Sequence, residues 1–246
     1  VEAAGAVAFE KLDPQLSWKC GRAAQEDFFF AQKVFEKEGI LRPCWGEHTY
    51  HESLSQHYAA AVWAGTKLYA LNGEGKIRER VLEDLDKLLD CQDHGETGTG
   101  LSGFFYRDEK KESIVHFSHQ AREHLFAQAL TEAMGTFGEY PGAKRWKRAM
   151  EEYGAYFKKL MAYASPYGML PSGLYCRSEL EDRETFDLVH PMLDFEKERE
   201  NYRQQLENGT CIGEGYFVRQ FPVWFSYRGN NAILLSMARS ASLLGK

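Results

Sequence analysis

The strongest constraint on the fold is a series of amphipathic helical segments that are joined in pairs by very short breaks. Residues 51–71 carry an apolar stripe at helical spacing, and Asn72-Gly73 ends it. A second segment, 76–92, follows at once, with its isoleucine, valine and leucines on one face and its charges mostly on the other. A short break between two amphipathic helices predicts an antiparallel helix hairpin.

The same arrangement recurs further along the chain. Residues 119–137 and 143–163 have helical patterns, and a break at Pro141 separates them. Each pair is followed by a long loop rich in glycine and aromatic residues, 94–112 in one case and 165–177 in the other. The repeat of roughly 65–70 residues fits a helix pair with a functional loop, and such units bury their apolar faces by stacking on one another. We therefore predict an all-α fold of helix-hairpin repeats.

The rest of the chain is also predicted to be largely helical. Residues 17–38 form a helix that Gly39 ends, and its run of three phenylalanines predicts packing on two sides. Residues 182–207 are the most charged stretch and favour a surface helix interrupted at Pro191. Because 1–12 resemble a helix interior and 230–244 a further apolar helix, we expect 1–246 to be one helical domain, a portion of a larger chain.

The charge and composition of the chain argue against several classes of function. The net charge is −6, with both signs interspersed and no block of lysine or arginine, so a nucleic-acid partner is not expected. No apolar run reaches the ~18 residues of a membrane span. The five cysteines are scattered, which argues against a zinc site and against a disulfide framework. We expect neither a metal ion nor another cofactor.

A first polar cluster, at 45–52, lies directly before the helical pattern that starts at 51. Its members of interest are Trp45, Glu47, His48, Tyr50, His51 and Glu52. A glycosidase needs one carboxyl group to protonate the leaving oxygen and another to activate water or attack carbon, and histidine can assist proton transfer near neutral pH. The alternative is that the two glutamates cap the helix and the histidines are surface residues.

A second cluster surrounds His119 and Glu123, which share a helix face because they are four residues apart. A histidine and a carboxylate at this spacing can bind zinc, but the paired histidines of an HExxH motif are absent. Arg122 suits a different role, because its planar guanidinium can bind the carboxylate of a uronic acid. The alternative is an ordinary ion pair that supports the start of a helix.

A third cluster combines Trp224 and Tyr227 with Arg228 and Asn230. A flat aromatic ring beside a forked donor matches a sugar ring that carries a carboxylate or a pair of hydroxyl groups. The alternative is that Trp224 is part of the core and that Arg228 pairs with an acid of a neighbouring helix.

The segment 221–236, Phe-Pro-Val-Trp-Phe-Ser-Tyr-Arg-Gly-Asn-Asn-Ala-Ile-Leu-Leu-Ser, together with the hairpin repeat, resembles the six-hairpin glycosidase superfamily. The resemblance implies an (α/α)6 toroid with a sugar cleft at one end of its inner helices. Members include unsaturated uronyl hydrolases and cellulase-type family 9 enzymes. The chain departs from that pattern in having fewer predicted helices than a full toroid, so a further domain or subunit is expected to complete it.

These observations lead to a specific expectation, a glycoside hydrolase acting on a polysaccharide or oligosaccharide that can contain uronic acids. Glu47, Glu52 and Glu123 are the candidate acids and bases, assisted by His48 and His51. The candidate substrate contacts are Trp45, Tyr50, His119, Arg122, Trp224, Tyr227 and Arg228. A polysaccharide lyase of the same fold and a non-catalytic helical-repeat binding module are the alternatives. A carbohydrate substrate favours a secreted or periplasmic location.

Overall fold

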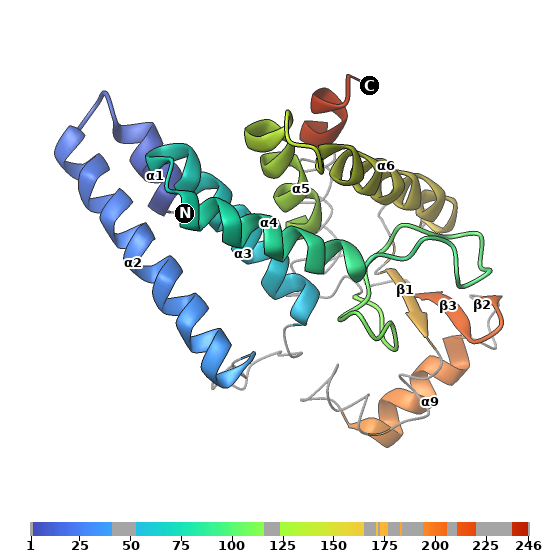
Figure 1. Cartoon of the computed structure of the whole chain (residues 1–246). Coiled ribbons are helices and arrows are strands. Elements are labelled where there is room, and N and C mark those ends of the chain that lie inside the picture. The colour runs from blue at the N-terminus through green and yellow to red at the C-terminus, as the bar shows by residue number, and fades with distance from the viewer. Residues whose placement is uncertain are drawn as a thin grey trace.

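The computed structural model describes residues 2–40, 53–115, 124–164, 171, 173–176, 183, 194–205, 211–219 and 238–245. Most of these residues are helical, which confirms the all-α prediction in its coarser form, whereas the toroid remains a prediction. The helices are α1 (Glu2–Phe9), α2 (Pro14–Glu38), α3 (Leu54–Asn72), α4 (Gly75–Asp90), α5 (His124–Phe137), α6 (Ala143–Leu160) and α9 (Phe195–Gln205), with the short 3₁₀ helix η1 (Met161–Tyr163). The strands are β1 (Gly173–Cys176), β2 (Cys211–Gly213) and β3 (Tyr216–Arg219). Figure 1 shows their arrangement.

The first predicted hairpin is confirmed as α3 and α4, which pack side by side (Figure 1). Ser53 begins α3 with a capping box, because its hydroxyl accepts from the Gln56 N–H while the Gln56 side chain accepts from the Ser53 N–H. Gly73 ends α3 in the left-handed region, at φ 67°. The apolar face of α4 is buried, with Ile77 and Leu85 fully shielded from solvent.

The second predicted hairpin is confirmed as α5 and α6, and the loop that follows α4 packs between the two hairpins. Phe105 of that loop stacks on Phe126 of α5 at 4.3 Å and meets the edge of Tyr153 of α6 at 5.3 Å. Phe104 lies beside Tyr156 at 5.7 Å between ring centroids. All of these rings are buried, so the loop is a structural link between the hairpins as well as a connection.

A small antiparallel sheet, in the order β1-β3-β2, lies near the C-terminal end of α6 (Figure 1). The prediction that 165–177 is entirely loop is wrong at 173–176, which form β1. Strands of three or four residues are too short to show an alternating pattern in sequence. The Tyr156 hydroxyl accepts the Leu174 N–H at 3.3 Å and joins the sheet to α6.

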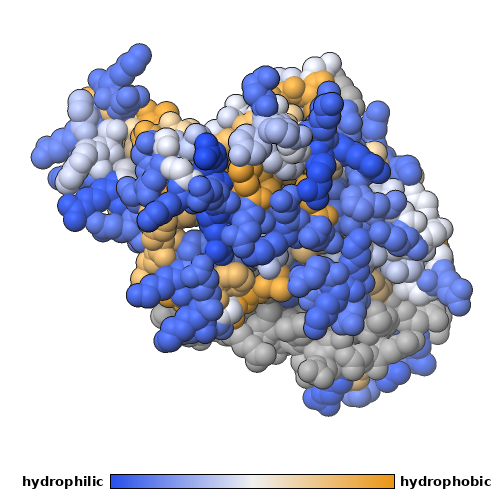
Figure 2. Space-filling view, in the orientation of Figure 1, coloured by the Kyte–Doolittle hydropathy of each residue, from blue (hydrophilic) through white to orange (hydrophobic). Residues whose placement is uncertain are grey.

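Helices α1 and α2 pack on each other and on α3 at one side of the molecule (Figure 1). The expectation that α2 packs on two sides is not met within the described part of the chain. Phe28 is buried between α2 and α3, whereas Phe29 is 38% and Phe30 68% exposed. Over the face drawn in Figure 2, polar and charged residues predominate and apolar residues are visible between them.

The charged stretch expected as a surface helix is helical at 183 and at 195–205, within the residues that the structure describes there. Residues 195–205 form α9, and Asp194 accepts the Lys197 N–H at 2.8 Å at its start. Of the apolar helix expected at 230–244, the described part confirms helix at 238–243, and the Ser240 hydroxyl hydrogen-bonds that of Thr131 on α5 at 2.6 Å. No helix among the described residues is long and apolar enough to cross a membrane.

The close contact between the loop and α6 gives a test of the packing. A Cβ atom at Gly103, where φ is +96°, would lie 2.3 Å from the Glu152 carbonyl oxygen, whereas one at Gly98, where φ is +67°, would meet nothing within 4 Å. Both alanine variants incur backbone strain, about 1 kcal/mol, but Gly103→Ala also forces the loop away from α6. We expect denaturant unfolding to show a loss of about 3 kcal/mol or more for Gly103→Ala. Equal losses for the two variants would contradict this packing.

Candidate functional site

The site residues predicted from sequence lie outside the described ranges. They are Trp45, Glu47, His48, Tyr50, His51, Glu52, His119, Arg122, Glu123, Trp224, Tyr227 and Arg228. Their roles therefore remain predictions. Two described residues that border the first two clusters, Ser55 and Val115, are both hydrogen-bonded to the loop that follows α4. The Ser55 N–H donates to the Arg107 carbonyl at 3.0 Å, and the Val115 N–H donates to the Phe105 carbonyl at 2.9 Å.

Asp93 lies at the start of this loop and is buried, with none of its surface exposed. One carboxylate oxygen accepts the Gly95 N–H at 2.9 Å, and the other accepts the Tyr106 hydroxyl at 3.3 Å. Burial, followed by the hydrogen bond with the carboxyl group of Glu96, raises the pKa of Asp93, and the Gly95 N–H only partly offsets this. Asp93 thus holds a proton to a higher pH than an exposed aspartate does.

Glu96 is the second acid of this pair, and its pKa is shifted in the opposite direction. Burial acts to raise the pKa of Glu96, but hydrogen bonds from the His94 N–H, from Asp93 and from Lys111 outweigh it and lower that pKa to about 2. The Lys111 ammonium lies 3.1 Å from a Glu96 oxygen. Neighbouring carboxyl groups whose pKa values are pushed apart can divide the roles of proton donor and permanent negative charge.

Two tyrosines lie beside this pair. Tyr106 belongs to the loop and Tyr216 to β3. Burial raises the pKa of Tyr106, with the Asp93 charge adding to the effect, and burial likewise raises the pKa of Tyr216. Both phenols therefore stay protonated near neutral pH and are suited to donate hydrogen bonds, not to remove protons.

A pocket of about 310 Å³ opens next to these residues, between the end of α4, the loop and α6. It is lined by Leu89, Asp90, Gln92, His94, Lys111, Arg145, Arg148, Ala149 and Glu152. Gln92 is fully buried, and its amide nitrogen donates to the Gly103 and Ala149 carbonyls at 2.9 and 3.0 Å. Its side-chain oxygen has no hydrogen-bond partner among the described residues, so this wall of the pocket offers a free acceptor.

The rim of this pocket carries two arginines held in ion pairs, and His94 shares a carboxylate with one of them. Arg148 and His94 each contact Glu152, at 2.7 and 2.9 Å, and Arg145 contacts Asp86 at 2.7 Å. Exposed pairs of this kind contribute little stability and can exchange partners. A ligand carboxylate could thus take the place of a protein carboxylate on an arginine, while a ligand hydroxyl donates to Gln92.

The sequence indicated 94–112 only as a glycine-rich loop. The available signal was the pair of acids in Asp93-His94-Gly95-Glu96, placed around a glycine that makes a tight turn with φ 107°. No group of three or more histidine, cysteine, aspartate or glutamate side chains suited to a metal ion is found within the described ranges.

No family model and no curated protein matches the chain. Among solved structures, it is similar to a chain described as polysaccharide lyase BACCELL_00875, with 13% sequence identity and a TM-score of 0.40. That alignment covers 100% of this chain and 73% of the other. Similarity at this level assigns neither a family nor an activity.

The two acids of the loop should affect the pH dependence of stability in opposite directions. Asp93 has a raised pKa, so its stabilising contribution is present below the ordinary value of 3.8 and is lost as the pH rises through its folded pKa. Glu96 has a lowered pKa, so its contribution is present above the ordinary value of 4.5 and is lost as the pH falls towards about 2.

We expect Asp93→Asn to remove the fall in the free energy of unfolding above pH 3.8, and Glu96→Gln to remove the rise between about pH 2 and pH 4.5. Chemical denaturation of the three proteins across this pH range measures both effects. The same pH profile for Asp93→Asn and the unchanged protein would refute the assignment of Asp93.

Proposed function

We propose that the chain is a carbohydrate-active enzyme that hydrolyses glycosidic bonds in a polysaccharide or oligosaccharide containing uronic acids. The observation that carries the proposal is the pocket of Gln92, whose rim holds Arg145 and Arg148 and which borders the loop of Asp93 and Glu96. The backbone of this loop is hydrogen-bonded to Ser55 and Val115, the described neighbours of two predicted clusters. A sugar acid needs hydroxyl acceptors and carboxylate partners, and this pocket supplies both types of group.

In this proposal Asp93 is a positioning residue, because it is fully buried and holds Tyr106 and the turn at Gly95. The direct acid and base remain Glu47, Glu52 or Glu123, with His48 or His51 assisting. Trp45, Tyr50, Trp224 and Tyr227 contact the sugar rings, and His119, Arg122 and Arg228 its polar groups. The pocket of Gln92 takes a neighbouring uronate, whose carboxylate contacts Arg145 or Arg148.

Elimination by a lyase is the competing reaction, because arginines that neutralise a uronate serve it equally well. A lyase also needs a base to remove the proton next to the carboxylate. Tyr106 and Tyr216 are poor candidates for that base, since burial raises the pKa of each. This difference favours hydrolysis at the described part of the site.

The products distinguish the two reactions. Incubation with uronic-acid oligosaccharides should release new reducing ends without the ultraviolet absorbance of an unsaturated uronide. At least one of Glu47→Gln, Glu52→Gln and Glu123→Gln should lower kcat by about 100-fold or more, the typical contribution of a general acid or base. Glu10→Gln, a change at an exposed position that does not line the pocket of Gln92, is the matched control.

Two results would overturn the proposal. Unsaturated products would assign a lyase instead, and full activity in all three glutamine variants would remove the catalytic acids proposed for it. Binding of the oligosaccharides without any product would favour the helical-repeat binding module.

A further inference from the structure

A second pocket, of about 370 Å³, lies between α1, α2 and α3 and shares no lining residue with the pocket of Gln92. Its lining is unusual for the number of alanines, which are Ala3, Ala4, Ala24, Ala31, Ala60, Ala61 and Ala64. These short side chains leave open space where the helices face one another. The volume falls within the range of small-molecule sites, about 300–1,000 Å³.

Three buried polar atoms on this lining have no hydrogen-bond partner within the described part of the chain. They are the side-chain oxygen of Gln32, Nε2 of His57 and the indole nitrogen of Trp63. Gln32 is only 7% exposed. Buried polar groups in proteins are almost always paired, so three unpaired atoms from α2 and α3 in one pocket point to a ligand.

The chemistry of these atoms restricts what the ligand can be. The Gln32 oxygen accepts a hydrogen bond, and the Trp63 N–H can only donate one. The His57 ring stacks on Phe35 at 3.7 Å, and burial, with the Arg80 charge adding, lowers the pKa of His57 to about 4. The imidazole is therefore neutral at pH 7 and can donate or accept, so the ligand must offer both donors and acceptors.

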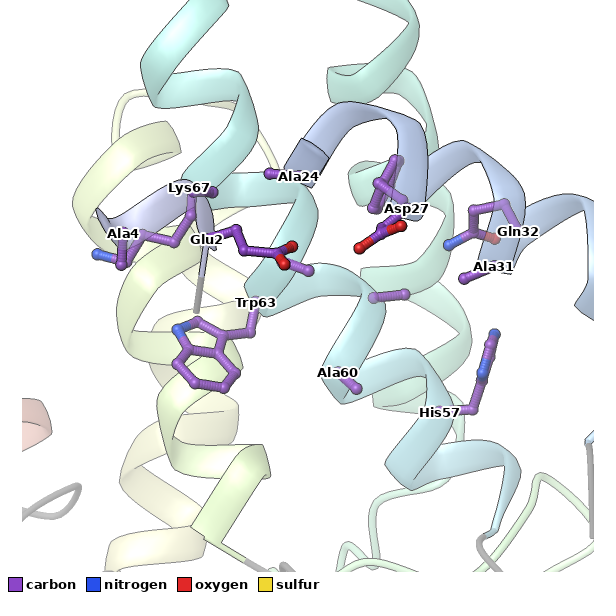
Figure 3. A pocket seen from close by; sticks show the side chains of 14 residues that line it. Glu2, Ala4, Ala24, Asp27, Ala31, Gln32, His57, Ala60, Trp63 and Lys67 are labelled. Carbon is purple, nitrogen blue, oxygen red and sulfur yellow. The ribbon is translucent and has the colours of Figure 1, made fainter. Parts of the chain in front are cut away.

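The charges around the pocket restrict the ligand further. Figure 3 shows the carboxylates of Glu2 and Asp27 between the Trp63 ring on one side and Gln32 and His57 on the other. Neither carboxylate has an ion-pair partner among the residues that the structure describes. Lys67, the only lysine or arginine among the described lining residues, is paired with Glu132 of α5 at 2.6 Å. The pocket therefore favours a cation.

We propose that this pocket binds a small amine that carries several hydroxyl groups, of the size and chemistry of an amino sugar. The ammonium group lies between Glu2 and Asp27, and hydroxyl groups pair with Gln32 and His57. The apolar face of the ring contacts the alanines. This site is separate from the proposed catalytic end, so its success or failure leaves the proposed function untouched.

Isothermal titration of the full chain with three probes of similar size tests the proposal. They are glucosamine, which is largely protonated at about pH 6.5, and the uncharged N-acetylglucosamine and glucose. Glucosamine should bind with a stoichiometry of one and at least about tenfold more tightly than the other two, a difference of about 1.4 kcal/mol. Absence of binding, or equal binding of all three, would overturn the proposal.

Single substitutions test whether glucosamine binds in this pocket. Asp27→Asn should weaken glucosamine binding by about tenfold, and Ala31→Leu should block it by filling the pocket. Glu26→Gln, a neighbouring exposed change whose carboxylate pairs with Arg22 away from the pocket, should leave the affinity unchanged. Asp27 and Ala31 are exposed, so both variants should keep the unfolding transition of the parent chain. Unchanged affinity in both would place the amine elsewhere.

Discussion

The arrangement of the helices depends on the aromatic loop that packs between the two hairpins. Phe105 contacts Phe126 and Tyr153, and Phe104 contacts Tyr156, all as buried rings. Each buried phenylalanine contributes about 1.5–3 kcal/mol relative to an exposed one. Since the rings belong to one short segment, they hold both hairpins and the intervening backbone in one arrangement. Gly103 permits this, because only a residue without a side chain fits so close to the backbone of α6.

The same packing gives the two acids of the loop, Asp93 and Glu96, different environments. The backbone of Asp93 is fixed by hydrogen bonds to Phe104 and Gly103, at 2.9 and 3.1 Å, so its side chain is held in the interior beside Tyr106. A buried carboxylate is costly unless it is hydrogen-bonded or protonated; Asp93 is hydrogen-bonded, and burial also raises its pKa. Glu96 is three residues further on and lies near solvent and Lys111. The loop thus places two acids of the same type in contrasting environments.

The sequence predicted the parts of the fold that local patterns determine. The hairpins follow from helical periodicity and from local signals such as Ser53 and Gly73. The strands at 173–176 and 216–219 were missed, because a strand of four residues gains its stability from a partner more than 40 residues away. The environment of Asp93 was missed for a related reason, since it depends on a hydrogen bond from Tyr106. The predicted clusters at 45–52, 116–124 and 224–230 remain predictions, because their interacting side chains lie outside the described residues.

The two pockets differ in charge, and the difference follows from which helix faces meet. At the loop end, the arginines of α6 meet the acids of α4 and of their own helix, so every positive group on the rim is already paired and the local charge is nearly balanced. Between α1, α2 and α3, by contrast, alanines make up half of the pocket lining, and Lys67 is paired with Glu132. The carboxylates of Glu2 and Asp27 are then left without a compensating charge. A balanced rim can exchange one carboxylate for another, whereas an uncompensated pair of carboxylates attracts a cation. The two sites should therefore select ligands of opposite charge.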